Sequence, residues 1–196
     1  MNNFGIYSLS ATESEILLWS HYADQHKGFC LGFDGKAFGF ENRTPIIEVD
    51  YQSKIPILSA IEIPANAILE INKANPNYTK HDVFKELKKR EQEILTDRTS
   101  NLVLKALSTK YIYWSYEKEW RVFRRPGSAL VKFNPRVLKT VTFGLKMLPE
   151  HKKTILNILS GPEWQHVELR QAIRSKVEFM IEAIPLKKEH VDEIIS

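Results

Sequence analysis

Residues 117–124 read Glu-Lys-Glu-Trp-Arg-Val-Phe-Arg, and their alternation predicts a β-strand. Successive side chains of a strand point to opposite faces of the sheet. Glu117, Glu119 and Arg121 are therefore expected on one face, with Trp120 on the other. Three charged groups in a row do not face a dry core, so this face is either a solvated ladder of ion pairs or the wall of a cleft. The pattern leaves both interpretations open.

A tight turn is expected directly after this strand. Residues 125–128 are Arg-Pro-Gly-Ser, which places Pro and Gly at the two central positions that a type II turn prefers. The segment 129–133 is predicted to be the return strand of a β-hairpin.

Helices and strands alternate irregularly through the rest of the chain. Thr12 and Glu15 have the spacing of a capping box and predict a helix over 13–25, which Gly28 ends. Apolar residues at helical spacing predict further helices over 81–107 and 149–160, and period-two patterns predict strands at 4–9, 29–34, 46–51, 137–144, 167–173 and 177–184. We therefore expect a single α+β domain over residues 1–196, with a mostly antiparallel sheet and a long helical insertion between the third and fourth strands.

Positive charge is concentrated in one part of the chain. The 196 residues include 28 Lys and Arg against 24 Asp and Glu, a formal net charge of +4. Eight basic and two acidic residues lie in 110–139, so the whole basic excess is found there. Its two acidic residues are Glu117 and Glu119. Such an excess favours an anionic partner without identifying it.

Simple features exclude several classes of protein. The longest apolar run, at 16–19, has about four residues, against the roughly 20 that a membrane-spanning helix needs. The first fifteen residues lack the basic and apolar regions of a secretory signal. Cys30 is the only cysteine and cannot form an internal disulfide. We therefore expect a cytoplasmic protein that does not bind membranes.

A second polar motif, Trp-Ser-His-Tyr-Ala-Asp-Gln-His-Lys-Gly, spans residues 19–28. His21 is a candidate general acid or base, and Tyr22 and His26 are candidate ligand-binding residues. A capping or hydrogen-bonding role within the fold is the alternative for either histidine. The two histidines would lie about 140° apart around a helix, so they cannot share one metal ion, and no metal site is expected.

Aromatic residues are interleaved with basic ones just before the predicted hairpin. Trp114 and Tyr116 are suited to stack on a flat ring, while Lys110, Arg124 and Arg125 could hold phosphates. A nucleic-acid-binding module that uses a basic, aromatic hairpin is therefore one interpretation. Packing of the aromatic side chains in the core is the other.

Several motifs together carry a family resemblance. They are Ser-Leu-Ser at 8–10, Leu-Trp-Ser-His-Tyr-Ala at 18–23, His-Lys-Gly-Phe-Cys-Leu-Gly-Phe-Asp at 26–34, Val-Asp-Tyr at 49–51, Lys110, and Trp-Ser-Tyr-Glu-Lys-Glu-Trp-Arg at 114–121. In this order they resemble the bacterial domain-of-unknown-function family numbered 2971, over about residues 7–144. The family name implies no settled activity. Its members usually carry an upstream Asn-Asp-Pro-Phe type motif, so we expect a short variant, or a non-enzymatic accessory protein that a partner completes.

The resemblance implies that both polar motifs form one site, with His21, Tyr22 and His26 converging on the two carboxylates and Arg121. The Glu-x-Glu pair also resembles the acidic motif of arginine-directed ADP-ribosyltransferases, although their first-strand Arg or His and their Ser-Thr-Ser segment are missing here. This likeness implies NAD as a ligand, and no other cofactor is expected.

Together these features predict a polar cleft that binds or acts on a nucleotide-like phosphorylated ligand. Glu119 would be the principal catalytic carboxylate and Glu117 its partner or the base that activates the acceptor. Arg121 would clamp an anion, while His21 and Tyr22 would position the ligand. NAD-dependent ADP-ribosyl transfer is one reaction that this set of residues suggests.

Overall fold

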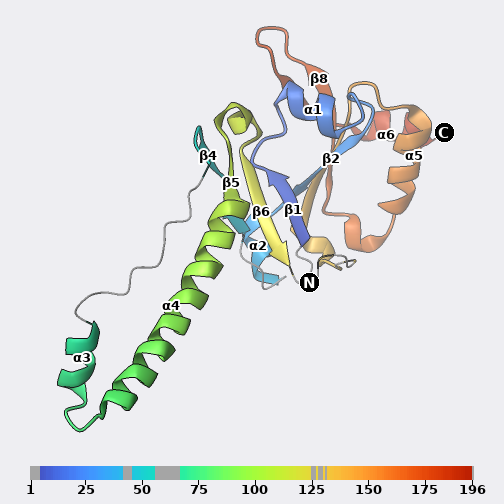
Figure 1. Ribbon diagram of the computed structural model, residues 1–196. Coiled ribbons are helices and arrows are strands. Elements are labelled where there is room, and N and C mark those ends of the chain that lie inside the picture. Colours follow the sequence, from blue (N-terminus) through green and yellow to red (C-terminus); the bar gives the residue numbers. More distant parts are fainter. Residues whose placement is uncertain are drawn as a thin grey trace. The chain divides into compact units, whose positions relative to one another are not determined.

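The computed structural model describes residues 5–41, 46–55, 67–124, 127, 130 and 132–195. The chain divides into two compact units, of which unit 1 comprises Met1–Val49 with Tyr113–Ser196 and unit 2 comprises Asp50–Ile112 (Figure 1). Helices and strands occur together and most strand pairs are antiparallel, so the predicted α+β class is confirmed. The expectation of one domain over the whole chain stays a prediction.

The first sheet of unit 1 is built around the strand that contains Glu119. In spatial order it consists of β1 (Gly5–Ser10), β6 (Glu119–Arg124) and β3 (Ile46–Glu48). Both pairings are antiparallel, and the register places Ser8 opposite Arg121 and Ser10 opposite Glu119. The polar face of β6 therefore continues onto β1.

The predicted hairpin after β6 is wrong within the described residues. Leu130, Lys132 and Phe133 of the proposed return strand lie in no strand, and residues 125, 126, 128, 129 and 131 lie outside the described part. Both edges of β6 are already paired, one with β1 and the other with β3. Phe133 packs into the core instead, edge-on against Phe33 with ring centroids 5.4 Å apart.

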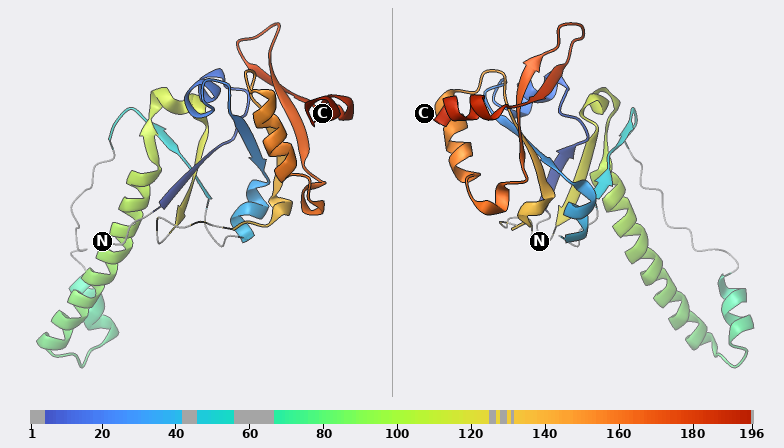
Figure 2. Two further views of the ribbon diagram at one scale, coloured as in Figure 1. Left: turned by 90° about the vertical axis from the view of Figure 1, so that its right-hand side faces the viewer. Right: turned by 180° about the vertical axis from the view of Figure 1, so that it is seen from behind.

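The second sheet of unit 1 has the order β2 (Phe29–Phe33), β7 (Leu138–Phe143), β8 (Glu168–Arg174) and β9 (Ile181–Pro185). Its pairings are antiparallel except for β7 with β8, which are parallel and joined through helix α5 (Pro149–Ile158). α5 and α6 (Lys188–Ile195) lie on one side of this sheet (Figure 2). Their apolar residues cover buried Val141 and Phe143.

Helix α1 (Ile16–Tyr22) is shorter than predicted at both ends. The cap is Glu15, whose carboxylate accepts from the backbone N–H of Leu17, whereas the hydroxyl of Thr12 bonds to that of Ser14. After Tyr22 the chain makes a left-handed turn, with positive φ at residues 24–26, before β2 begins. A second short helix, α2 (Gly35–Glu41), follows β2.

Unit 2 contains the long helix. Its elements are β4 (Asp50–Gln52), α3 (Ala67–Ala74), α4 (Lys80–Ser108) and β5 (Thr109–Tyr111), with β4 and β5 parallel. Thr79 and Asp82 form a capping box at the start of α4, where their side chains satisfy exposed N–H groups. The predicted strand 46–51 is divided, because Val49 separates β3 from β4. None of the described helices has the length and apolar character to cross a membrane.

Candidate functional site

The two glutamates of the Glu-x-Glu motif are separated by one residue in the sequence but belong to different elements. Glu117 ends the 3-10 helix η1 (Ile112–Glu117), and Glu119 begins β6. Lys118 between them adopts a left-handed conformation with φ of 45°. The prediction that Glu117 lies on the same strand as Glu119 is therefore wrong. A non-glycine residue pays about 1 kcal/mol for this conformation, and such strain often marks functional segments.

Glu119 is almost completely buried, with 5% of its surface exposed, and is held by two neighbours. Arg121 donates from Nε to Oε1 over 2.8 Å and from Nη2 to Oε2 over 3.1 Å. Ser8 of β1 donates from Oγ to the same Oε1 over 2.6 Å. A bidentate guanidinium and a hydroxyl together stabilise the ionised carboxylate and fix its orientation.

Arg121 was predicted to clamp an anion. Its Nε and Nη2 are both directed to Glu119, and its side chain is only 15% exposed, so Arg121 orients this carboxylate. The role as an anion clamp stays a prediction. Ser8, which holds the same oxygen, belongs to the Ser-Leu-Ser motif but was not predicted as a site residue, because that motif does not indicate which partner a serine hydroxyl meets.

Glu117 is also buried, with 4% of its surface exposed, and it meets helix α1. The hydroxyl of Tyr22 donates to Glu117 Oε1 over 2.9 Å. Ser10 Oγ donates to the backbone carbonyl of Glu117 over 2.7 Å and so ties η1 to β1. The structure thus brings together residues that are 95 positions apart in the chain. We call Ser8, Tyr22, Glu117, Glu119 and Arg121 the carboxylate site.

The two histidines are placed differently from Tyr22. His21 is exposed and its ring lies edge-on to that of Tyr22, with centroids 6.3 Å apart. His26 shares a hydrogen bond of 3.1 Å between its Nε2 and Ser20 Oγ, and it lines a cavity with Lys146 and Arg174. In the described part of unit 1, neither histidine makes a hydrogen bond to the two carboxylates. The predicted convergence is therefore seen for Tyr22 but not for His21 or His26.

The aromatic and basic candidates are spread over both units. Trp114 and Tyr116 lie on η1 with ring centroids 6.0 Å apart, and Trp114 is exposed rather than packed in the core. Arg124 is exposed at the end of β6, Lys110 lies on β5 of unit 2, and Arg125 lies outside the described residues. The described part of the chain thus lacks the return strand on which the basic hairpin interpretation depended.

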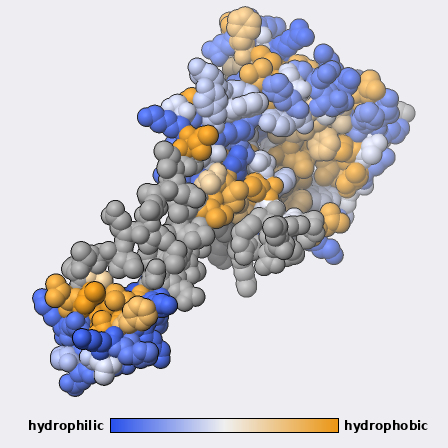
Figure 3. Space-filling view, viewed as in Figure 1, coloured by the Kyte–Doolittle hydropathy of each residue, from blue (hydrophilic) through white to orange (hydrophobic). Residues whose placement is uncertain are grey.

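A large cavity lies between the two sheets of unit 1, and no sequence pattern indicated it. Its volume is about 1230 Å³. Trp120, on the opposite face of β6 from Arg121, forms one wall, and Cys30 and Gly32 of β2 form another. Apolar side chains gather in a recess beside β2 in Figure 3. Burial raises the pKa of the Cys30 thiol to about 11, and the charge of Glu13 contributes. We call this space the inter-sheet cavity.

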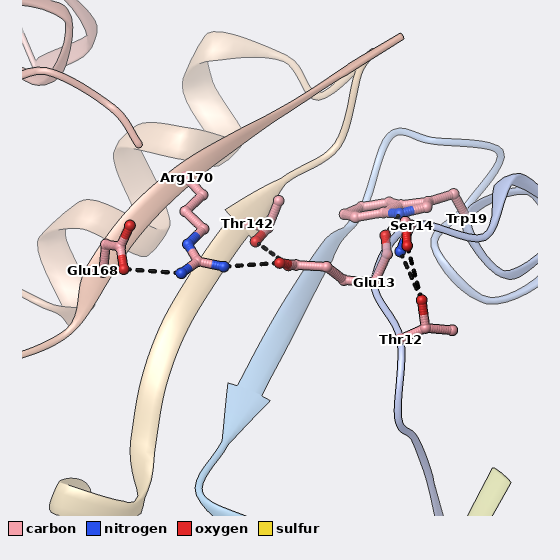
Figure 4. A network of polar contacts seen from close by, with 7 residues as sticks. All are labelled: Thr12, Glu13, Ser14, Trp19, Thr142, Glu168 and Arg170. Carbon is pink, nitrogen blue, oxygen red and sulfur yellow. Dashed lines mark hydrogen bonds and ion pairs between the residues drawn. The ribbon is translucent and has the colours of Figure 1, made fainter. Parts of the chain in front are cut away.

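Glu13 lines this cavity and forms the centre of a polar network (Figure 4). Arg170 Nη1 donates to its Oε1 over 2.8 Å, and the buried Thr142 donates to its Oε2 over 2.8 Å. Arg170 Nη2 also donates to Glu168 over 3.0 Å, which lowers the pKa of Glu168. The network joins the segment after β1 to β7 and β8. It could not be predicted, because 157 positions separate Glu13 from Arg170.

Metal binding finds no support in the described residues, since no group of three or more His, Cys, Asp or Glu side chains there could hold an ion.

Residues 18–122 match the family model described as a protein of unknown function, DUF2971. These residues make up more than half of the chain, so the chain belongs to this family. Comparisons with curated proteins and with solved structures gave no match.

Proposed function

We propose that this member of the DUF2971 family is an enzyme whose carboxylate site acts on a nucleotide-like phosphorylated ligand, with transfer of ADP-ribose from NAD as its reaction. One observation carries the proposal. Two buried carboxylates, Glu117 and Glu119, lie two positions apart in the chain and are held by partners from three separate segments. Buried acids that are oriented in this way are costly to maintain, and they occur most often where a protein uses their charge.

Glu119 is the group suited to stabilise positive charge. Arg121 and Ser8 both bind it in the geometry that favours the carboxylate form. When the bond between a ribose carbon and a pyridinium nitrogen breaks, that carbon takes on oxocarbenium character. A fixed carboxylate near it stabilises this transition state electrostatically.

Glu117 is the group suited to accept a proton. Tyr22 donates to Glu117 Oε1 over 2.9 Å and so fixes the orientation of the carboxylate. In the reaction the bond between C1′ and the nicotinamide nitrogen breaks, and its electron pair leaves with nicotinamide. The acceptor forms a bond to C1′, and its proton passes to Glu117.

The proposal is tested by incubating the protein with NAD and measuring nicotinamide release and ADP-ribosylated products by mass spectrometry. Glu119→Gln should lower turnover about a hundredfold or more, which is typical for loss of an electrostatic stabiliser. Glu48→Gln is the matched control, because Glu48 lies opposite Trp120 on β3 and is exposed on the other face of the sheet. It should leave turnover unchanged.

A second variant separates chemistry from folding. Glu119→Gln leaves Arg121 without its carboxylate and could lower stability, whereas Tyr22→Phe removes one hydroxyl from a side chain that is 67% exposed. Tyr22→Phe should reduce turnover about tenfold and lower the free energy of unfolding by about 1–3 kcal/mol, the cost of one hydrogen bond lost to buried Glu117. Circular dichroism at the assay temperature shows that the variant is folded. Absence of nicotinamide release from the unmodified protein, with NAD and a range of acceptors, would remove the enzymatic proposal.

A further inference from the structure

A group of cationic side chains surrounds a second cavity of unit 1, under the loop 175–180 between β8 and β9. The cavity has a volume of about 520 Å³. Three basic side chains, one acidic side chain and one histidine line it. Apolar residues of α1 and of the segment between β7 and α5 complete the lining. The polar and charged lining includes His26, Lys146, Arg174, Lys176 and Glu178.

The charges around this cavity are not balanced. Lys146, Arg174 and Lys176 stand against the single carboxylate of Glu178. Among the ion pairs of the described residues, none includes these three cations. Like charges around one small space repel each other, and a bound anion relieves this repulsion. The arrangement therefore favours a bound anion.

His26 is brought to this cavity by an unusual backbone. Asp24, Gln25 and His26 have φ angles of 43°, 53° and 71°, three consecutive non-glycine residues in the left-handed region. The carbonyl of His26 accepts from the N–H of Lys146 over 2.9 Å, which fixes the turn against the end of β7. Each such residue costs about 1 kcal/mol or more, so the surrounding contacts must hold the turn in place.

The imidazole of His26 is incompletely satisfied. Its Nε2 is bonded to Ser20, but its buried Nδ1 has no hydrogen-bond partner among the described residues. Buried polar atoms without partners are uncommon and often indicate a missing ligand or water. Partial burial lowers the pKa of His26, and the charges of Lys146 and Arg174 lower it further. An anion placed among these cations would have the opposite effect.

Apolar side chains flank Lys176 on the loop 175–180. Val177 is 92% exposed and Phe179 is fully exposed. Figure 3 shows apolar side chains at the tip of this loop, at the top of the view, bordered by hydrophilic ones. A ligand that contacts this loop would thus meet positive charge and apolar surface together.

From these observations we infer that the cavity under the β8–β9 loop binds a phosphate group, held by Lys146, Arg174 and Lys176, with His26 as a fourth partner in its charged form. The site is separate from the carboxylate site, and the inference does not depend on the proposed reaction. The phosphate can belong to a soluble phosphorylated compound or to a lipid headgroup, and the two sources are separated by experiment.

The first experiment uses sulfate as the probe, because its charge does not change between pH 5.5 and 8. Sulfate should raise the melting temperature of the full chain more than chloride does at equal ionic strength, and the excess should be lost in Arg174→Ala. Lys153→Ala is the matched control, since Lys153 is exposed on α5. Comparison between variants removes the general stabilisation that sulfate gives to any protein.

The ring of His26 supplies a second readout. Its NMR signals would not respond to sulfate if the surrounding cations only stabilised the fold. Sulfate should shift the NMR signals of the His26 ring and raise the pH at which the ring titrates, because a bound anion favours the charged imidazole. The other charged groups that face His26 in this cavity are Lys146, Arg174, Lys176 and Glu178. Binding should therefore tighten as the pH falls from 8 to 6. Arg174→Ala should weaken sulfate binding about tenfold or more, the usual effect of losing one charge-assisted hydrogen bond.

Vesicles distinguish the source of the phosphate. If the source is a lipid, the protein should sediment with vesicles of phosphatidylglycerol in phosphatidylcholine but not with phosphatidylcholine alone, and Phe179→Ala should reduce the bound fraction. Sulfate binding without vesicle binding supports a soluble phosphorylated ligand. The inference is overturned if sulfate neither shifts the His26 signals nor stabilises the protein more than it stabilises Arg174→Ala.

Discussion

At the scale of single residues, the proposed function depends on how a few polar groups are held. Ser8 and Arg121 bind the carboxylate of Glu119, and Tyr22 donates to Glu117, so these contacts orient both acids. Preorganised charge of this kind is more effective than charge that must reorient during a reaction. Arg121 illustrates what geometry adds to pattern, because its contact with Glu119 could not be read from the alternation of charges alone.

The only cysteine of the chain gives a direct test of the inter-sheet cavity. Burial and Glu13 raise the pKa of Cys30 from 9.0 to about 11. At pH 8 its thiolate fraction is therefore about a hundredfold lower than that of a cysteine with a pKa of 9.0. Alkylation by iodoacetamide at pH 8 should be slower by roughly this factor in the folded protein than in urea. Equal rates in both states would show that Cys30 is freely accessible.

At the scale of elements, the end of β7 and the turn after α1 are held together by their backbones. Gly144 donates its N–H to the carbonyl of Gly28 over 2.9 Å. A Cβ added at Gly144 would lie 2.3 Å from the carbonyl oxygen of His26, closer than real Cβ atoms approach. Glycine is therefore required here by close approach, whereas the three left-handed residues of the turn are not glycines.

Replacement of Gly144 by alanine should disrupt this contact. We expect a loss of about 1–3 kcal/mol in the free energy of unfolding, because the obstructing atoms belong to the backbone and cannot move aside cheaply. Urea denaturation followed by circular dichroism measures the loss. Gly35→Ala is the matched control, since nothing lies within 4 Å of a Cβ at that position. Equal stability of the two variants would contradict the assigned packing.

At the scale of the whole molecule, His26 should couple folding to pH. Its pKa is lower in the folded protein than in the unfolded chain, so the unfolded chain binds more protons at mildly acidic pH. The stabilisation linked to the neutral imidazole is fully present above the unfolded pKa of about 6.5 and is lost as the pH falls toward the lower folded pKa. Lys146 and Arg174 add to this effect.

His26→Gln should therefore lose less stability than the unmodified protein between pH 7.5 and pH 5.5. Urea denaturation at both pH values, in a buffer without phosphate or sulfate, provides the measurement. Parallel losses in the two proteins would show that His26 does not contribute to the pH dependence.

Much of the fold could be predicted from local pattern. The strands β1, β2, β7 and β8 and the helices α4 and α5 lie close to their predicted positions, because periodicity and capping are encoded within a few residues. The hairpin after β6 was wrong for a tertiary reason. Pro and Gly at 126 and 127 favour a turn locally, but the edges of β6 are occupied by β1 and β3.

The sequence by itself determined the α+β class, the types of most elements and the family motifs, and it singled out Glu117 and Glu119 as candidate site residues. Only the tertiary structure decided which groups meet. It paired Tyr22 with Glu117, joined Glu13 to Arg170 and placed His26 among Lys146 and Arg174. The physical reason is range: helix and strand propensity act between near neighbours, whereas these contacts join residues from about 95 to 157 positions apart that only folding brings within hydrogen-bonding or electrostatic reach.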